Sequence, residues 1–197
     1  MNVVSHNEYS GFFLVCPLLI ILGCSGSSDY DSVRGCLAAS ADALEARDPA
    51  RVFEALDERS RFAMAAIVKA RVAARALILA DYPASERPKA LSALGDAAEV
   101  ETPVELFHKR CDATCMQRLA DLVGAPKSEV AAGAEVVVTT VRGNTLHMHA
   151  GRNGRYGIVW NTQPLSDERA QASRELVQIR ENAAVYRRRR DLETRVR

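Results

Sequence analysis

The stretch EVVVTTVRGNTLHMHAGRNGRYGIVWN, residues 135–161, decides the fold class. Three segments in it have the composition of β-strands: Glu135–Val141, Thr145–Ala150 and Arg155–Asn161. Gly143-Asn144 and Arg152-Asn153-Gly154 separate them, and both are short enough for neighbouring strands to pair antiparallel. The stretch therefore predicts a small antiparallel sheet of about three strands.

The chain before this sheet has helical periodicity and recognisable helix starts. Asp48-Pro49 and Thr102-Pro103 each place a capping side chain before a proline, and Glu105 completes a capping box. The expected helices cover about 32–47, a short segment from 49, then 61–83, 86–94, a segment from 103, and 113–123. In the longest of them, three- and four-residue steps predict a core face of Phe62, Ala65, Ala66, Val72, Ala76 and Leu79.

After the sheet, a final helix is expected to begin at Ser166 and to end in Arg187–Arg190. Its apolar residues step by four and three and predict a docking stripe: Ala172, Leu176, Ile179, Ala183 and Tyr186. The arginines suit the C-terminus of a helix, so a solvated helix end is expected, with anionic lipid headgroups as the alternative. Residues 33–197 are thus expected to form one α+β domain.

The N-terminus carries a different kind of signal. Residues 11–23 read GFFLVCPLLIILG, and the polar run SGSSDYDS follows Cys24. The apolar run Phe12–Leu22 has 11 residues, too few for a helical membrane span of about 20 but typical of a secretory signal peptide. Ile21-Leu22-Gly23-Cys24 resembles the lipobox of bacterial prolipoproteins, in which the cysteine is acylated and the chain is cut before it.

This resemblance implies a signal peptide over residues 1–23, lipid attachment at Cys24 and a flexible tether over residues 24–32. Two or three fatty acyl chains, of which palmitate is typical, anchor a protein durably. Ser25, in place of Asp, implies sorting to the outer membrane, facing the periplasm. The segment departs from the pattern in one respect, because no Lys or Arg precedes Arg34. The alternative interpretation is a buried apolar element with an incidental cysteine.

Three further cysteines then remain outside the signal peptide. His108, Cys111 and Cys115 are spaced by three and four residues, which on an unbroken helix favours one face and a zinc site. Outside the cytoplasm oxidation is expected, and a helix break would let Cys111 and Cys115 form a disulfide, the favoured interpretation. Pairing with Cys36, free thiols, and a nucleophilic cysteine with His108 as its base remain alternatives.

His147 and His149 lie two residues apart on a predicted strand, so both imidazoles face the same way, as in a metal site. No acidic residue or cysteine adjoins them in the sequence, which favours a polar outer strand face instead. P-loop, dinucleotide-binding, nucleophile-elbow and zinc-protease motifs are all missing from the sequence. Neither a catalytic residue nor a metal or cofactor is therefore predicted.

Charge and composition narrow the function further. The 197 residues carry a net charge of +1, which argues against a nucleic-acid-binding domain. Residues 1–135 are acidic, with 14 basic and 19 acidic groups, whereas residues 136–197 carry 12 and 6. The expected function is a lipid-anchored, non-enzymatic interaction module for an envelope protein or a small ligand. The alternative is a lipid-anchored enzyme or metal-binding protein that uses His147 and His149 or the region of Cys111 and Cys115.

Two segments carry a family resemblance. ADALEARDPARVFEAL, residues 41–56, followed by helices, and GRNGRYGIVW, residues 151–160, resemble the small NTF2-like domains that occur in bacterial lipoproteins. The resemblance spans about Val33–Thr162. It implies that the helices pack into the concave face of a curved antiparallel sheet. The helix expected after Ser166 is an addition to that pattern.

Overall fold

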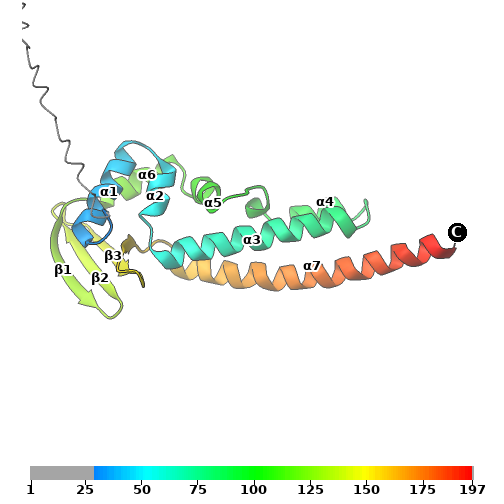
Figure 1. The fold of residues 1–197 in the computed structure, drawn as a ribbon. Coiled ribbons are helices and arrows are strands. Elements are labelled where there is room, and N and C mark those ends of the chain that lie inside the picture. Colours follow the sequence, from blue (N-terminus) through cyan, green and yellow to red (C-terminus); the bar gives the residue numbers. More distant parts are fainter. Residues whose placement is uncertain (1–28, 197) are drawn as a thin grey trace, which may run out of the picture.

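The computed structural model describes residues 29–196 (Figure 1). The predicted signal peptide, Cys24 and the first part of the predicted tether lie outside this range. Figure 1 shows a sheet with short helices at one end and two long helices, α3 (Glu58–Asp81) and α7 (Thr162–Val196), projecting from it side by side. We call residues 29–68 and 99–165 the body, and residues 70–95 and 172–196 the arm.

The predicted α+β class is confirmed, and the sheet lies in the body. Its order is β1-β2-β3-β4, with every neighbouring pair antiparallel. The four strands are β1 (Pro126–Ala132), β2 (Glu135–Thr140), β3 (Thr145–Ala150) and β4 (Tyr156–Ile158). The sequence therefore predicted β2, β3 and β4 but missed β1. That strand is exposed along nearly its whole length, so it lacks the apolar alternation that identifies a half-buried strand.

Four short helices cover the sheet, and each begins after a side chain that caps it. They are α1 (Val33–Glu45) after Ser32, α2 (Pro49–Glu54) after Asp48, α5 (Pro103–Arg110) after Thr102, and α6 (Ala113–Leu122) after Asp112. The helix starts predicted at Asp48-Pro49 and Thr102-Pro103 are confirmed. The capping carboxylates and hydroxyls satisfy backbone N–H groups that the first helical turn leaves unpaired.

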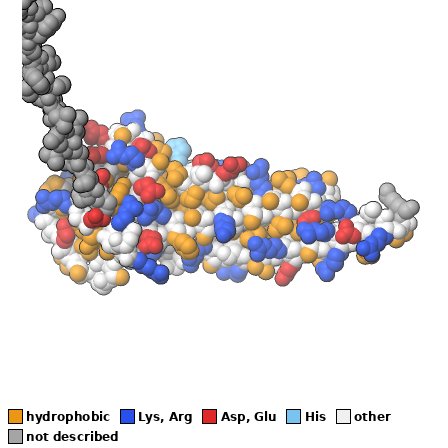
Figure 2. Space-filling view, viewed as in Figure 1, with side chains coloured by type: hydrophobic (Ala, Val, Ile, Leu, Met, Phe, Trp, Pro, Cys, Tyr) orange, Lys and Arg blue, Asp and Glu red, His pale blue; other side chains and the backbone are white. Residues whose placement is uncertain are grey.

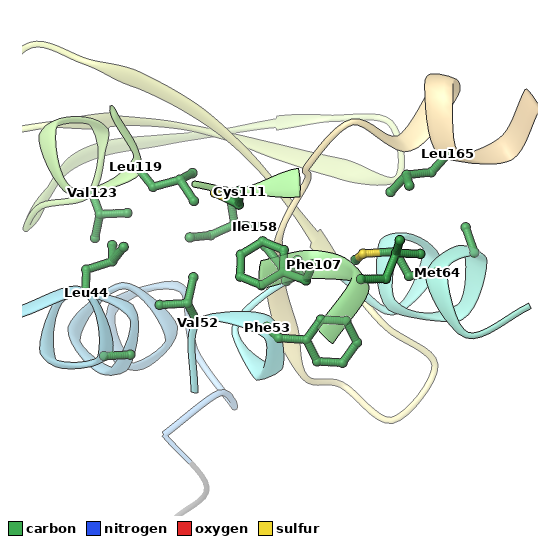
Figure 3. Packing of buried hydrophobic residues seen from close by; sticks show 14 of the residues in the cluster. Leu44, Val52, Phe53, Met64, Phe107, Cys111, Leu119, Val123, Ile158 and Leu165 are labelled. Carbon is green, nitrogen blue, oxygen red and sulfur yellow. The ribbon is translucent and has the colours of Figure 1, made fainter. Parts of the chain in front are cut away.

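The core of the body forms where these helices meet the inner face of the sheet (Figure 3). Val138, Leu146 and Met148 come from the sheet and are at most 5% exposed. Phe107 lies at the centre, with its ring centroid 6.1 Å from that of Phe53 and 5.2 Å from that of Trp160. Large side chains from both layers thus exclude water around one aromatic cluster.

The structure corrects the core face predicted for α3. Phe62, Val72 and Leu79 are 60%, 40% and 45% exposed, and the buried face instead contains Ala63, Met64, Ile67, Val68, Ala70, Ala74 and Ile78. An alanine-rich helix offers more than one apolar stripe, and the buried one is the stripe that faces the body core and α7. The ring of Phe62 is partly covered by the guanidinium of Arg169, 5.6 Å from its centroid.

The final helix is longer than predicted. It begins at Thr162 rather than Ser166, because Pro164 falls in the first turn, where its missing N–H costs nothing. It continues past Arg190 to Val196, and its 35 residues span about 52 Å at about 1.5 Å per residue. The predicted docking stripe is confirmed, since Ala172 and Ala183 are buried and the other three residues pack against α3 and α4 (Arg87–Ser92).

The two arm helices start at one junction with the sheet. Asp57 donates its N–H to the Ile158 carbonyl at 2.9 Å, and its buried carboxylate accepts from the N–H groups of Arg59 and Ser60. The Ser60 hydroxyl lies 2.7 Å from the Asp57 carboxylate and 2.9 Å from the Trp160 carbonyl, two residues before α7. Strand β4 therefore fixes the starting points of both α3 and α7.

Candidate functional site

The two histidines of β3 lie on the outer face of the sheet, as the strand period predicts. His147 Nδ1 is 3.2 Å from Glu135 Oε2, and the guanidinium of Arg59 donates to Glu135 Oε1 at 2.8 Å. The hydrogen bond from Arg59, helped by His147, lowers the pKa of Glu135 below its usual value. Glu135 is thus held as a carboxylate by the Arg59 guanidinium, with the His147 ring on its other side.

His149 has a different setting from His147. It is half-buried, and its Nδ1 has no hydrogen-bond partner among residues 29–196. It lines an open groove of about 620 Å³ together with Arg59, Phe62 and Arg152. Within the described part of the chain, no three His, Cys, Asp or Glu side chains converge as a metal site requires. Of the two histidines, His149 lines this groove and His147 does not.

The cysteines of the body are separated into a bonded pair and a free thiol. Cys111, at the end of α5, and Cys115, in the first turn of α6, form a disulfide, which the Asp112 break between the helices permits. Within residues 29–196, Cys36 alone is a free cysteine, and burial raises the pKa of its thiol to about 11. A thiol that stays protonated is a poor nucleophile and a poor metal ligand.

A depression of about 330 Å³ lies beside this disulfide, between α1 and α6. Leu44, Met116 and Ala120 form much of its wall, while the side chains of Arg47 and His108 line it as well. The zinc hypothesis had grouped His108 with the two cysteines; in the structure His108 and Cys111 line this depression together with Arg47, which follows the end of α1.

The arginines Arg187–Arg190 are exposed to solvent, as the sequence predicted, but they do not end their helix, which continues to Val196. Arg187 and Arg190 bind the carboxylate of Asp81 at 2.5 and 3.0 Å, and Arg190 also reaches the Ala80 carbonyl at 3.3 Å. The hydrogen bond from Arg187 is the main cause that lowers the pKa of Asp81. These cations therefore serve the C-terminus of α3 rather than that of their own helix.

A groove of about 630 Å³ runs along the arm between α4 and α7. Ala90, Ala93, Leu94 and Ile179 contribute apolar surface, and the side chain of Lys89 lies among the lining residues. The space-filling view shows apolar side chains interspersed with charges along the length of the molecule (Figure 2). Because α4 and α7 are about 90 residues apart in the sequence, no local pattern signalled this groove.

Comparisons with protein-family models, curated proteins and solved structures found no match to this chain. The NTF2-like resemblance therefore stays a prediction. Among the helices of residues 29–196, none combines the length and the apolar content that a membrane span requires.

Proposed function

We propose that this chain is a lipid-anchored lipoprotein of the bacterial cell envelope. The proposal rests on the sequence of residues 12–24, where an 11-residue apolar run ends in Ile-Leu-Gly-Cys. Acyl chains on Cys24 attach the protein to a membrane, and Ser25 directs it to the outer membrane with its folded part in the periplasm. The disulfide between Cys111 and Cys115 supports an oxidising compartment.

The folded part is a non-enzymatic interaction module, and the observation that carries this proposal is the groove between α4 and α7. An exposed apolar groove of this size on a projecting helix pair is typical of a helix-binding surface. Neither the histidines nor the cysteines of residues 29–196 combine a nucleophile, a base and an oriented third group. Both features favour binding over catalysis.

The partner that fits the groove is an amphipathic helix of another envelope protein. Ala90 and Ala93 let a helix backbone approach closely, and Ile179 with Leu94 supplies apolar contact on the floor. Lys89 makes no ion pair or hydrogen bond through its side chain within the described residues, so it is available to an acidic residue of the partner. Glu86 and Glu175 also line the groove, but they bind Tyr186 and Arg71, so the unpaired Lys89 favours an apolar helix face with an acidic edge.

Mass spectrometry of the membrane fraction tests the anchor. We expect a mature N-terminus at acylated Cys24, and we expect Cys24→Ser to leave an unacylated, unprocessed chain. A mature protein that begins elsewhere, or that partitions into the soluble fraction without acylation, contradicts the lipid anchor. That result would not contradict the proposed partner-binding groove, which the next experiment tests.

Affinity purification from native envelopes tests the groove with a matched pair of variants. Ala93→Arg places a long cation in the groove, whereas Ala76→Arg places the same side chain at an exposed position of α3 outside it. We expect Ala93→Arg to lose a partner that wild type and Ala76→Arg both retain. Equal recovery of the partner with both variants contradicts the proposed surface.

A further inference from the structure

We propose that the depression beside the Cys111–Cys115 disulfide binds a small amphipathic carboxylate. We call it the disulfide pocket and define it by Leu44, Arg47, His108, Met116 and Ala120. It lies on the body, apart from the groove between α4 and α7, and depends on neither the anchor nor the helix partner. The proposal therefore adds a ligand site to the proposed function.

The wall of the disulfide pocket is apolar and held in place by covalent and buried contacts. Leu44 and Cys111 are buried, and Met116 and Ala120 pack against the core of the body. The disulfide fixes the corner between α5 and α6, the helices that carry the lining residues His108 and Met116. At about 330 Å³, the pocket lies at the lower end of the range for small-molecule sites, about 300–1,000 Å³.

The charges around this wall favour an anion. Arg47 and His108 have no hydrogen-bond or ion-pair partner for their side chains within residues 29–196. The carboxylate of Asp112 also lines the pocket, but it accepts from the Cys115 N–H at 2.9 Å as the cap of α6, where the positive end of the helix offsets its charge. A guanidinium presents two parallel N–H donors that match a carboxylate, so Arg47 fits this head group best.

The backbone of Arg47 supplies an independent observation. Its φ is +52°, and the bonds Arg47 N–H to Leu44 and Asp48 N–H to Ala43 close the end of α1 around it. Helices that end in this way favour glycine at the left-handed position, because a side chain there costs conformational energy. The chain accepts that cost at Arg47, which lines the pocket, and this points to a role of Arg47 in binding.

Isothermal titration of the full chain with sodium octanoate tests the proposal, with octylammonium and octanol as ligands of matched length. We expect octanoate to bind at one site and the other two to bind at least tenfold more weakly, because only the carboxylate pairs with Arg47. Equal affinity for octanoate and octylammonium, or no binding of octanoate, overturns the proposal.

Variants of the same chain separate the charge from the fold. Arg47→Gln is expected to weaken octanoate at least tenfold, whereas Arg118→Gln, an exposed arginine of α6 outside the pocket, leaves the affinity unchanged. Arg47→Gly is expected to lose binding while its melting temperature equals or exceeds that of wild type. Wild-type octanoate affinity in Arg47→Gly contradicts the assignment of Arg47.

Discussion

The body and the arm are stabilised in different ways. The body buries large side chains between helices and a sheet, including Leu37, Leu56 and Phe107. The buried cluster of the arm, which Ala98 joins from the adjoining turn, is small and half alanine: Ala74, Ile78, Tyr82, Leu94, Ala98 and Ala183. Two helices with so little buried apolar area do not hold together alone. The arm therefore depends on the junction with the body, and its surface remains available for binding.

Charge pairs supply what the arm lacks in apolar contact. Arg71 of α3, whose side chain is 7% exposed, pairs with Glu175 of α7. Nearer the C-terminus of α3, Asp81 pairs with Arg187 and Arg190 of α7. In each pair, the two partners lie at similar distances from the first residues of α3 and α7. The two helices therefore run parallel. Substitutions that alter buried side chains are therefore expected to destabilise mainly the body. Substitutions that remove an ion pair are expected to destabilise mainly the arm.

The junction is where one substitution is expected to break both regions at once. In Gly157→Ala the added Cβ would lie 2.5 Å from Asp57 Cα and 2.6 Å from the Leu56 carbonyl oxygen, both backbone atoms. We expect a loss of about 2–4 kcal/mol in the free energy of unfolding, measured by chemical denaturation. Gly124→Ala is the control, since its Cβ would meet side chains at 3.7 Å and is expected to change stability little. Similar losses in both variants would contradict the close packing at Asp57.

Removing the partner of Arg71 is expected to affect the arm specifically. Glu175→Ala leaves a buried guanidinium without its counter-charge, at a cost of about 2–3 kcal/mol. The matched change in the body, Glu54→Ala, breaks a pair with 24% and 50% exposed side chains and is expected to cost less than about 1 kcal/mol. Hydrogen exchange is expected to accelerate in the arm while the sheet stays protected. Equal acceleration in the sheet would contradict the separation of the two regions.

Reduction of the disulfide is expected to act on the body. Opening the short loop between Cys111 and Cys115 is expected to cost about 2 kcal/mol by the chain-entropy relation. The double variant Cys111→Ala/Cys115→Ala gives the same measurement without reductant. Hydrogen exchange in α5 and α6 is expected to accelerate, with exchange at the tip of the arm unchanged. An unchanged free energy of unfolding in the double variant would contradict a stabilising role of the disulfide in the body.

Acid is expected to loosen the tip of the arm. The hydrogen bond from Arg187 lowers the pKa of Asp81, so pairing contributes stability above the unfolded pKa of about 4 and is lost as the pH falls through the lower, folded value. We expect faster exchange in residues 183–196 as the pH falls below about 4, after correction for the intrinsic rate. Asp81→Asn removes the titrating carboxyl group. In this variant, hydrogen exchange in residues 183–196 should therefore no longer accelerate below about pH 4.

The sequence predicted the parts of this fold that follow from local patterns. The helix starts at Asp48-Pro49 and Thr102-Pro103, the strand Thr145–Ala150 and the docking stripe of α7 depend on neighbouring residues alone. The exposed strand β1 gave no such pattern, because its burial does not alternate. Local composition also predicted the wrong face of α3, since the choice between its apolar stripes depends on where α7 packs.

The candidate sites were less predictable for the same reason. Arg187 and Arg190 pair with Asp81, more than 100 residues away in the sequence, so their own helix gave no indication of it. Arg47 carried no signal either, because its left-handed backbone is a property of the end of α1 in three dimensions. His147 and His149 were correctly placed on one strand face, but the position of Glu135 and Arg59 around them required the sheet register and the start of α3.

The central claim is that the arm binds a protein partner while the body supports it. Site-specific photo-crosslinking in intact cells tests it most directly, with the photoreactive residue at Ala93 in the arm groove or at Val130, 62% exposed on β1 of the body. We predict one crosslinked protein of defined mass from Ala93, lost when Lys89 is changed to Glu, and none from Val130. Crosslinking from Val130 alone, or an Ala93 product that is unaffected by Lys89→Glu, would contradict the claim.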